Sequence, residues 1–219
     1  MSIESLIKER NIKSLIHFTR IENLENILNK GIVSRNSIGE DGFKNVWDDF
    51  FEVENNKQKY LYNDDLRLDN KKDYSCFSIS FPNNEMLYRL RKNNENSHWA
   101  ILILSSNILL NYDCLFYPCN AASNSVRHED IESFKGEVAL ENMFYSEGRD
   151  SYLTNKYPTD VQAEVLIKGI ISPEYIVFVF LDNESLVNQY KEKYPNYKFL
   201  YCKKDTKVFN TRKAFIHGY

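Results

Sequence analysis

Short, strongly apolar runs of four to eight residues most limit the fold of this chain. Runs of this length, rich in β-branched and aromatic residues, are typical of buried strands. The sequence predicts strands at Leu15–Phe18, Tyr74–Phe81, Trp99–Leu104, Val161–Ile167 and Tyr175–Phe180, with one or two more near the C-terminus. Helices are expected at Ile21–Leu28 (ended by Gly31), from Asn83 or Asn84 through Leu90, at Ile131–Phe144 and after Ser185. Because strands and helices do not alternate regularly, we expect an α+β fold rather than a doubly wound sheet.

The 219 residues fit a single domain, 1–219, and their composition excludes several classes of protein. There are 28 Lys and Arg and 31 Asp and Glu, a net charge of −3, which excludes a uniformly basic nucleic-acid binder. No apolar run approaches the ~18 residues of a membrane span, and the first residues lack the layout of a secretion signal, so no membrane partner is expected. Four cysteines do not make a disulfide framework and indicate a reducing, cytoplasmic setting.

Two segments depart from this pattern of strands and helices. Residues 36–73 predict a long loop with a short helix at Trp47–Val53, and loops this long are often functional. The part from Lys191 to Tyr219 holds eight Lys or Arg against two acids, interleaved with aromatic residues. Such a mixture is able to track a phosphate backbone, but a solvated helix face beside an edge strand is the simpler interpretation.

Three polar positions in apolar surroundings are candidates for chemistry. Strand alternation over 161–167 gives one apolar face and places Gln162 and Glu164 on the other face, together with Leu166. A buried carboxylate is costly unless it is paired or functional, whereas an edge strand would leave it in water. His17 and Thr19 end the first strand, point the same way and suit a sugar hydroxyl or an amide. Arg67 lies among acids, where it forms either a surface ion pair or paired hydrogen bonds to a pyrophosphate.

Taken in order along the chain, several segments resemble the DarT family of bacterial toxins, which transfer ADP-ribose from NAD to nucleic-acid bases. The segments are LIHFTRIENLENILNKGIVSRN, LRLDN with DYSCFSISFPNNEMLYRLRK, WAILILSSNIL, FYPCNAASN and YPTDVQAEVLIKGIISPEYIVFV. The resemblance is strongest over residues 13–181, and the basic, aromatic part 182–219 carries little of it. It implies an ADP-ribosyltransferase fold, in which two small packed β-sheets and flanking helices surround an NAD cleft.

The resemblance also implies roles for individual side chains. Glu164 corresponds to the catalytic glutamate, and Arg67 to an arginine implicated in NAD binding and in catalysis. The remaining NAD contacts that it implies are His17, Phe18, Thr19 and Tyr88. The acceptor is positioned by Gln162 and by the loop from Phe144 to Asp160, in which the residues suited to stacking and phosphate contact are Tyr145, Arg149, Tyr152 and Tyr157.

These residue types fit such a reaction. Cleavage of the nicotinamide–ribose bond creates positive charge on the ribose, and a carboxylate at the 2′-hydroxyl stabilises that charge. Because stacking hides a base inside a duplex, single-stranded DNA or RNA is the expected acceptor, and the identity of the base stays open. NAD is the expected co-substrate. No metal is expected, because Cys114, Cys119 and His128 are too widely spaced for a typical zinc site.

The resemblance further implies an antitoxin protein as a partner. Two alternatives remain open at this point. One is an RNA 2′-phosphotransferase, a family that shares the fold and the early His-x-Thr pattern but grips its 2′-phosphate with basic residues. The other is a module that binds NAD or single strands without chemistry and is indifferent to the loss of Glu164.

Overall fold

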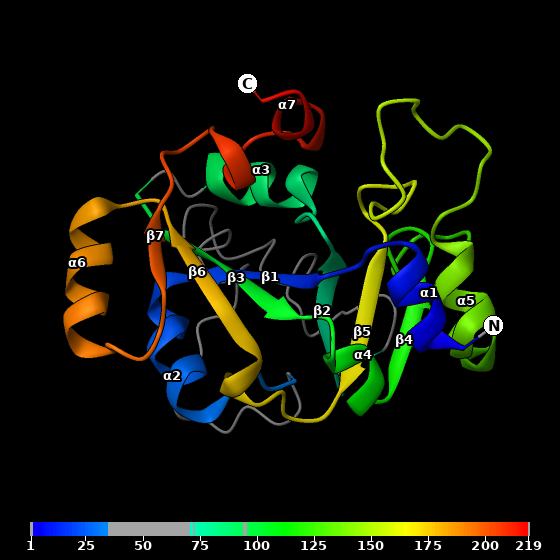
Figure 1. Cartoon of the computed structure of the whole chain (residues 1–219), viewed down its shortest axis with the longest axis horizontal. Helices are drawn as coiled ribbons and strands as arrows, with labels where there is room; N and C mark the ends of the chain where they lie inside the picture. The colour runs from blue at the N-terminus through cyan, green and yellow to red at the C-terminus, as the bar shows by residue number, and fades with distance from the viewer. Residues whose placement is uncertain (1, 35–70, 72, 94–95, 219) are drawn as a thin grey trace, which may run out of the picture.

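The structure is a computed structural model that describes residues 2–34, 71, 73–93 and 96–218. Seven strands in this part of the chain form one sheet, in the order β4-β5-β2-β1-β3-β6-β7 (Figure 1). The strands are β1 (Ser14–Arg20), β2 (Tyr74–Ile79), β3 (Trp99–Ser105), β4 (Cys114–Tyr117), β5 (Glu164–Lys168), β6 (Ile176–Leu181) and β7 (Phe199–Tyr201). Every neighbouring pair is antiparallel except β6 and β7, which confirms the predicted α+β class.

The sheet consists of two halves that meet at a narrow junction between β1 and β2. β1 pairs with β3 along all seven of its residues. It pairs with β2 only through Leu15↔Ile79 and Ile16↔Ser78, and the strands of the two halves run in clearly different directions (Figure 1). The two separate sheets expected from the sequence are therefore found as the halves β4-β5-β2 and β1-β3-β6-β7 of one continuous sheet.

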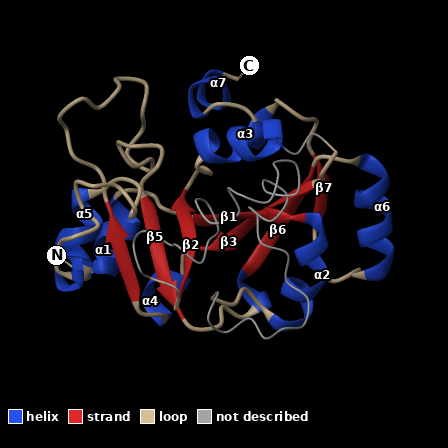
Figure 2. Ribbon diagram, turned by 180° about the vertical axis from the view of Figure 1, so that it is seen from behind, coloured by secondary structure: helices blue, strands red, loops and turns tan. Residues whose placement is uncertain are grey.

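Helices cover both faces of this sheet (Figure 2). They are α1 (Ile3–Glu9), α2 (Ile21–Lys30), α3 (Asn84–Asn93), α4 (Ile108–Asn111), α5 (Gly136–Asn142), α6 (Glu184–Lys193) and α7 (Arg212–His217), with 3₁₀ turns η4 (Ile131–Phe134), η5 (Pro173–Tyr175) and η6 (Lys207–Phe209). The main buried cluster packs α1, α2, α5 and α6 against the face that carries Leu15 and Leu102. A second cluster packs α3 and η6 against the opposite face of the same strands, through Ile16 and Ile101.

Most of the predicted elements are confirmed, and the differences have local causes. Gly31 ends α2 as predicted, with φ +91°. The predicted helix 131–144 is divided into η4 and α5, because Lys135 between them has an extended backbone. β5 begins only at Glu164, since residues 161–163 form a turn. The short elements α1, β4 and α7 are additional to those expected, and the predicted helix at 47–53 lies outside the described residues.

Gly31 offers a test of how tightly α2 is joined to the sheet. A Cβ at this position would lie 2.3 Å from the Ile171 carbonyl oxygen, and the backbone is left-handed. Gly169 has a similar φ of +92° but open space around it. We expect Gly169→Ala to lower the free energy of unfolding by about 1–2 kcal/mol, and Gly31→Ala by roughly 3 kcal/mol or more, because the clash adds to the backbone cost. Urea unfolding of both variants checks this, and equal losses would contradict it.

Candidate active site

Glu164 is the first residue of β5 and lies buried within the sheet. It pairs with Tyr117, the last residue of β4, and only 9% of it is exposed. Two donors reach its carboxylate from the segment that follows β4. The Ala121 backbone N–H donates to Oε2 over 3.0 Å, and Asn120 Nδ2 donates to Oε1 over 3.3 Å. These hydrogen bonds offset the cost of burying the carboxylate and fix its orientation.

The turn at 120–122 is built to present these donors. Asn120 Oδ1 accepts the Ala122 N–H over 2.9 Å, a local turn that asparagine favours. Since Oδ1 is committed to the backbone, the amide nitrogen is the end that faces Glu164. Ala121 is fully buried among apolar side chains, which fixes its N–H. The sequence analysis names this Asn-Ala-Ala segment only within the resemblance, and a turn-forming asparagine just after a strand is the signal that would have singled it out.

His17 occupies the junction between the two halves of the sheet. Its Nδ1 lies 2.9 Å from the Cys76 carbonyl oxygen of β2, beyond the point where the β1–β2 ladder ends. A carbonyl only accepts, so Nδ1 carries the proton, and in the neutral ring Nε2 is the acceptor. Burial lowers the pKa of His17, and the hydrogen bond to Cys76 raises it by less, so the imidazole is neutral at pH 7.

The ladder register determines how far His17 lies from Glu164. Continuing the β1–β2 register puts His17 level with Phe77, which pairs with Val165, the residue after Glu164. Only β2 lies between β1, which carries His17, and β5, which carries Glu164. The backbones of these two residues are therefore about 10 Å apart, which is two strand spacings. The imidazole and the carboxylate thus come from neighbouring parts of one sheet. Arg67, the third side chain expected here, lies outside the described residues.

The other predicted NAD contacts are placed less directly. Thr19 is buried, and its Oγ1 accepts the Asn23 side-chain N–H over 2.9 Å, which ties β1 to α2. Phe18 is half-buried and lies edge-on to Trp99, with ring centroids 6.5 Å apart. Tyr88 is 58% exposed on α3. The roles of these three residues toward NAD stay predictions.

Two arginines brace the loop that joins α5 to β5. Arg149 Nη1 donates to the Tyr157 carbonyl and to Thr159 Oγ1, each over 3.0 Å, and its Nη2 donates to a third oxygen of the same loop. Arg212 of α7 is buried and donates to the carbonyls of Pro158 and Thr159 over 2.7 and 2.9 Å. Burial lowers the pKa of both guanidinium groups, but arginine stays charged in proteins, so both act as fixed cations on backbone carbonyls.

The predicted acceptor-positioning residues of this loop form an inner and an outer set. Tyr157 is only 3% exposed in a small apolar cluster, and Arg149 is committed to the loop itself. Tyr145 is 41% exposed, and Tyr152 is half-buried beside His217, with ring centroids 5.5 Å apart. Base stacking by this loop stays a prediction, and the two outer tyrosines are better placed for it than Tyr157.

Gln162 connects the same loop to α3. Its Nε2 donates to Glu85 Oε2 over 3.1 Å, and its backbone N–H donates to Asp160 Oδ1 over 2.7 Å. The Gln162 side-chain amide therefore faces the first turn of α3. Its role in positioning the acceptor stays a prediction. Sequence reasoning missed Glu85 and Arg212, because partners that are distant along the chain leave no local pattern.

Other features of the described residues lie apart from this site. A cavity of about 330 Å³ adjoins Cys114 and Lys168, at the opposite end of β4 and β5. Lys168 is about 13 Å along β5 from Glu164, so the cavity is separate. Burial, helped by Asp113, raises the pKa of Cys114 to about 12, which disfavours a nucleophilic thiolate.

The described residues contain no His, Cys, Asp and Glu grouping suited to a metal ion. None of the described helices has the length and apolar character needed to cross a lipid bilayer.

A split sheet with a histidine at the junction and a buried glutamate on a nearby strand is the arrangement expected of an ADP-ribosyltransferase. The family model described as ssDNA thymidine ADP-ribosyltransferase, DarT, matches residues 16–207. Because this match spans most of the chain, the chain belongs to the DarT family. The resemblance inferred from the sequence is confirmed.

Individual relatives are similar in sequence or in fold. A DNA ADP-ribosyl transferase–DNA ADP-ribosyl glycohydrolase fusion protein of Thermosipho africanus is 25% identical over 187 residues, which are 82% of this chain and 45% of that protein. The chain thus spans about half the length of this curated relative. Thermus sp. 2.9 DarT in complex with NAD+ has a TM-score of 0.52 at 17% identity, covering 87% of this chain and 95% of that one. The same protein with ADP-ribosylated ssDNA has a TM-score of 0.57 at 15% identity, covering 92% and 97%.

His17→Asn tests the half-buried, neutral imidazole. Its folded-state pKa lies below the unfolded value, so below about pH 6.5 protons bind preferentially to the unfolded chain. The stabilisation from His17 is therefore present above that pH and is lost as the pH falls toward the folded pKa. We expect the difference in unfolding free energy between wild type and His17→Asn to shrink between about pH 7.5 and about pH 5.5 in urea titrations. A difference that does not vary with pH would contradict this assignment.

Proposed function

We propose that this chain transfers ADP-ribose from NAD to a thymidine base in single-stranded DNA. The observation that carries the proposal is the buried Glu164 carboxylate, oriented by Asn120 and Ala121 beside the sheet junction that His17 occupies. Membership of the DarT family supplies the donor and the acceptor class. The complexes of the Thermus protein with NAD+ and with ADP-ribosylated ssDNA support the same pair of substrates.

The chemistry assigns Glu164 to the ribose of NAD. As the bond to nicotinamide breaks, positive charge develops on the ribose, and an oriented carboxylate at the 2′-hydroxyl stabilises that charge. Nicotinamide departs as a neutral molecule, so its departure needs no acid. Because the turn at 120–122 holds the carboxylate before substrate arrives, little reorganisation is left for the reaction step.

The acceptor must supply a nucleophilic nitrogen and lose a proton. Thymine has no exocyclic amine, so the nitrogen is one of its ring atoms. The ring nitrogen that carries a proton is engaged by adenine in a duplex, which favours a single strand. We assign presentation of the base to the loop before β5, with Tyr145 and Tyr152 as the outward aromatic rings, Arg149 as its internal brace and Gln162 at the approach to Glu164.

The NAD contacts that belong to the proposal are His17, Phe18, Thr19, Tyr88 and Arg67. The neutral His17 offers Nε2 as an acceptor for a ribose hydroxyl, while Nδ1 is held by the Cys76 carbonyl. An antitoxin partner also belongs to the proposal. The fused glycohydrolase of the Thermosipho relative supports a partner that removes the ADP-ribose again. The relatives described above act on DNA, so they lend no support to the RNA acceptor considered from the sequence.

Glu164→Gln is the direct test of the reaction. The substitution keeps the shape of the side chain and removes the charge, so we expect transfer to fall by roughly 10²–10³-fold or more while NAD still binds. The measurement is mass spectrometry of an oligonucleotide with one thymidine after incubation with NAD, beside a control in which cytidine replaces that thymidine. Wild-type binding of NAD and DNA without any transfer would instead favour the non-catalytic module.

Asn120→Asp tests the hydrogen bond from Asn120 to the Glu164 carboxylate. It places a second carboxylate at the position 3.3 Å from Glu164 Oε1, and two carboxylates so close resist ionising together. We expect the acid limb of the pH–rate profile to move to higher pH, with little change in KM for NAD. Asn124→Asp, at an exposed asparagine of the same segment, is the matched control and should leave the profile unchanged. Identical profiles for the two variants would remove the assigned role of Asn120.

A further inference from the structure

Positive charge is concentrated in α3 and in residues 198–217, which together we define as the basic cap. The cap contains nine Lys and Arg and two acids, Glu85 and Asp205, a net charge of +7. The whole chain carries −3, so the remaining residues carry −10. Such an uneven distribution creates a local field that attracts polyanions, although the protein as a whole is acidic.

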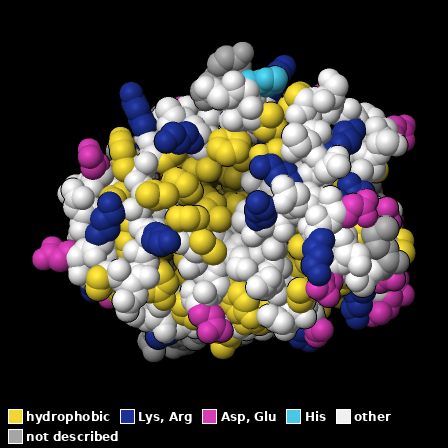
Figure 3. Space-filling view, in the orientation of Figure 1, with side chains coloured by type: hydrophobic (Ala, Val, Ile, Leu, Met, Phe, Trp, Pro, Cys, Tyr) yellow, Lys and Arg dark blue, Asp and Glu magenta, His cyan; other side chains and the backbone are white. Residues whose placement is uncertain are grey.

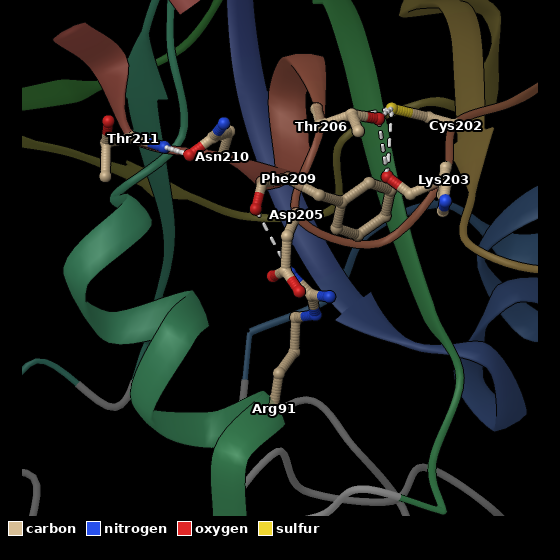
Figure 4. A network of polar contacts seen from close by, with 8 residues as sticks. All are labelled: Arg91, Cys202, Lys203, Asp205, Thr206, Phe209, Asn210 and Thr211. Atoms are coloured by element: carbon tan, nitrogen blue, oxygen red, sulfur yellow. Dashed lines mark hydrogen bonds and ion pairs between the residues drawn. The ribbon is translucent and has the colours of Figure 1, made fainter. Parts of the chain in front are cut away.

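Arg91 of α3 holds the two parts of the cap together (Figure 4). Its Nη1 donates to the Phe209 carbonyl oxygen over 3.1 Å and lies 3.4 Å from the Asp205 carboxylate. Its guanidinium also lies over the Phe209 ring, 5.0 Å from the centroid. One of the two acids is therefore neutralised inside the cap, and Glu85 is engaged by Gln162. These internal contacts join the two parts of the cap.

Six of the cations are exposed at the surface of the cap: Arg89, Lys92, Lys198, Lys203, Lys207 and Lys213. None of these six forms an ion pair with another described residue. Two exposed aromatic rings accompany them, Tyr88 on α3 and Tyr201 on β7, which is 44% exposed. Figure 3 shows Lys and Arg side chains around a hydrophobic hollow below the position of α3.

The cap adjoins the loop that leads to Glu164. Arg212 of the cap donates to two carbonyls of that loop, and Lys213 Nζ lies 5.9 Å from the centroid of the Tyr152 ring. On the α3 side, Glu85 accepts from Gln162, two residues before Glu164. The cap thus contacts the loop before β5 through α7 and through α3, and the second contact lies two residues from Glu164.

We propose that the basic cap is the track for the single-stranded DNA that flanks the acceptor nucleotide. Its lysines bind phosphates, and Tyr201 stacks on a base. This inference rests on the function proposed above. Single strands are bound by cations spread along a surface, combined with aromatic rings, rather than by one closed pocket. An acidic partner protein would also match the positive charge of the cap. Its binding, however, would need neither exposed aromatic rings nor a connection between the cap and Glu164.

The backbone at Lys207 is an independent observation in favour of this track. Its φ is +45°, in the left-handed region where glycine is favoured and a lysine is not. The chain thus keeps a cation at an unfavourable backbone position, and such positions concentrate at functional surfaces. Lys207→Gly should therefore leave the protein no less stable while weakening its use of DNA.

The experiment compares substrate length, because a track outside the site matters only for long strands. Wild type, a cap variant (Lys203→Gln, Lys207→Gln, Lys213→Gln) and a control variant (Lys13→Gln, Lys30→Gln, Lys168→Gln) are assayed with NAD. The substrates are oligonucleotides of about 5 and about 25 nucleotides with the same single thymidine, and the salt concentration runs from about 50 to about 200 mM. All six lysines are exposed, so both variants are expected to fold.

We expect the cap variant to lose roughly tenfold in kcat/KM on the long strand and to match wild type on the short one. The salt dependence on the long strand should also weaken, by a slope of about 2 for three lost contacts to single-stranded phosphates. The control variant should match wild type on both. If the cap variant has the same kcat/KM as wild type on both oligonucleotides at every salt concentration, the cap does not bind the DNA strand, and the proposal is overturned. Absence of transfer by wild type on either strand would instead overturn the proposed function.

Discussion

Two N–H donors that the chain delivers to the Glu164 carboxylate help to keep it buried and oriented. Both donors come from residues more than 40 positions away in sequence, Asn120 and Ala121. They arrive there because β4 pairs with β5 and ends at Tyr117, opposite Glu164, so the chain turns back over the carboxylate as it leaves the strand. The half-sheet β4-β5-β2 therefore fixes the position of the Glu164 carboxylate. A shift in the β4–β5 register would move this candidate catalytic group.

His17 serves structure and chemistry through the same contact. A sheet whose halves are joined by only two residue pairs leaves backbone groups at the junction without ladder partners, and the imidazole supplies a donor for the Cys76 carbonyl. That hydrogen bond selects the tautomer, and burial keeps the ring neutral. The hydrogen bond that completes the junction therefore also leaves Nε2 as the acceptor that the proposed NAD contact requires.

The sequence was sufficient for features that depend on local pattern. Apolar runs predicted the main strands, Gly31 was recognised as the end of α2, and Glu164 was placed on the face opposite Val165. It was insufficient where a side chain acts over a long range. The resemblance implies phosphate contact for Arg149, which stays a prediction, and the sequence did not reveal that its guanidinium donates three hydrogen bonds to the loop itself. Asn120 follows a strand and forms a turn, which is a local signal, but its contact with Glu164 depends on the β4–β5 pairing, which no local window contains.

The uneven distribution of charge within the chain reconciles its acidic net charge with the proposed action on a polyanion. The internal cations of this region donate hydrogen bonds to carbonyls (Arg149 and Arg212) or pair with a carboxylate (Arg91), and so tie the loop and the cap together. The outer cations are then displayed from fixed positions, which lowers the entropy lost when a flexible strand binds. The rest of the chain carries a net charge of −10, so the proposed attraction of a polyanion is confined to the cap. The net charge of −3 therefore does not argue against the proposed nucleic-acid substrate.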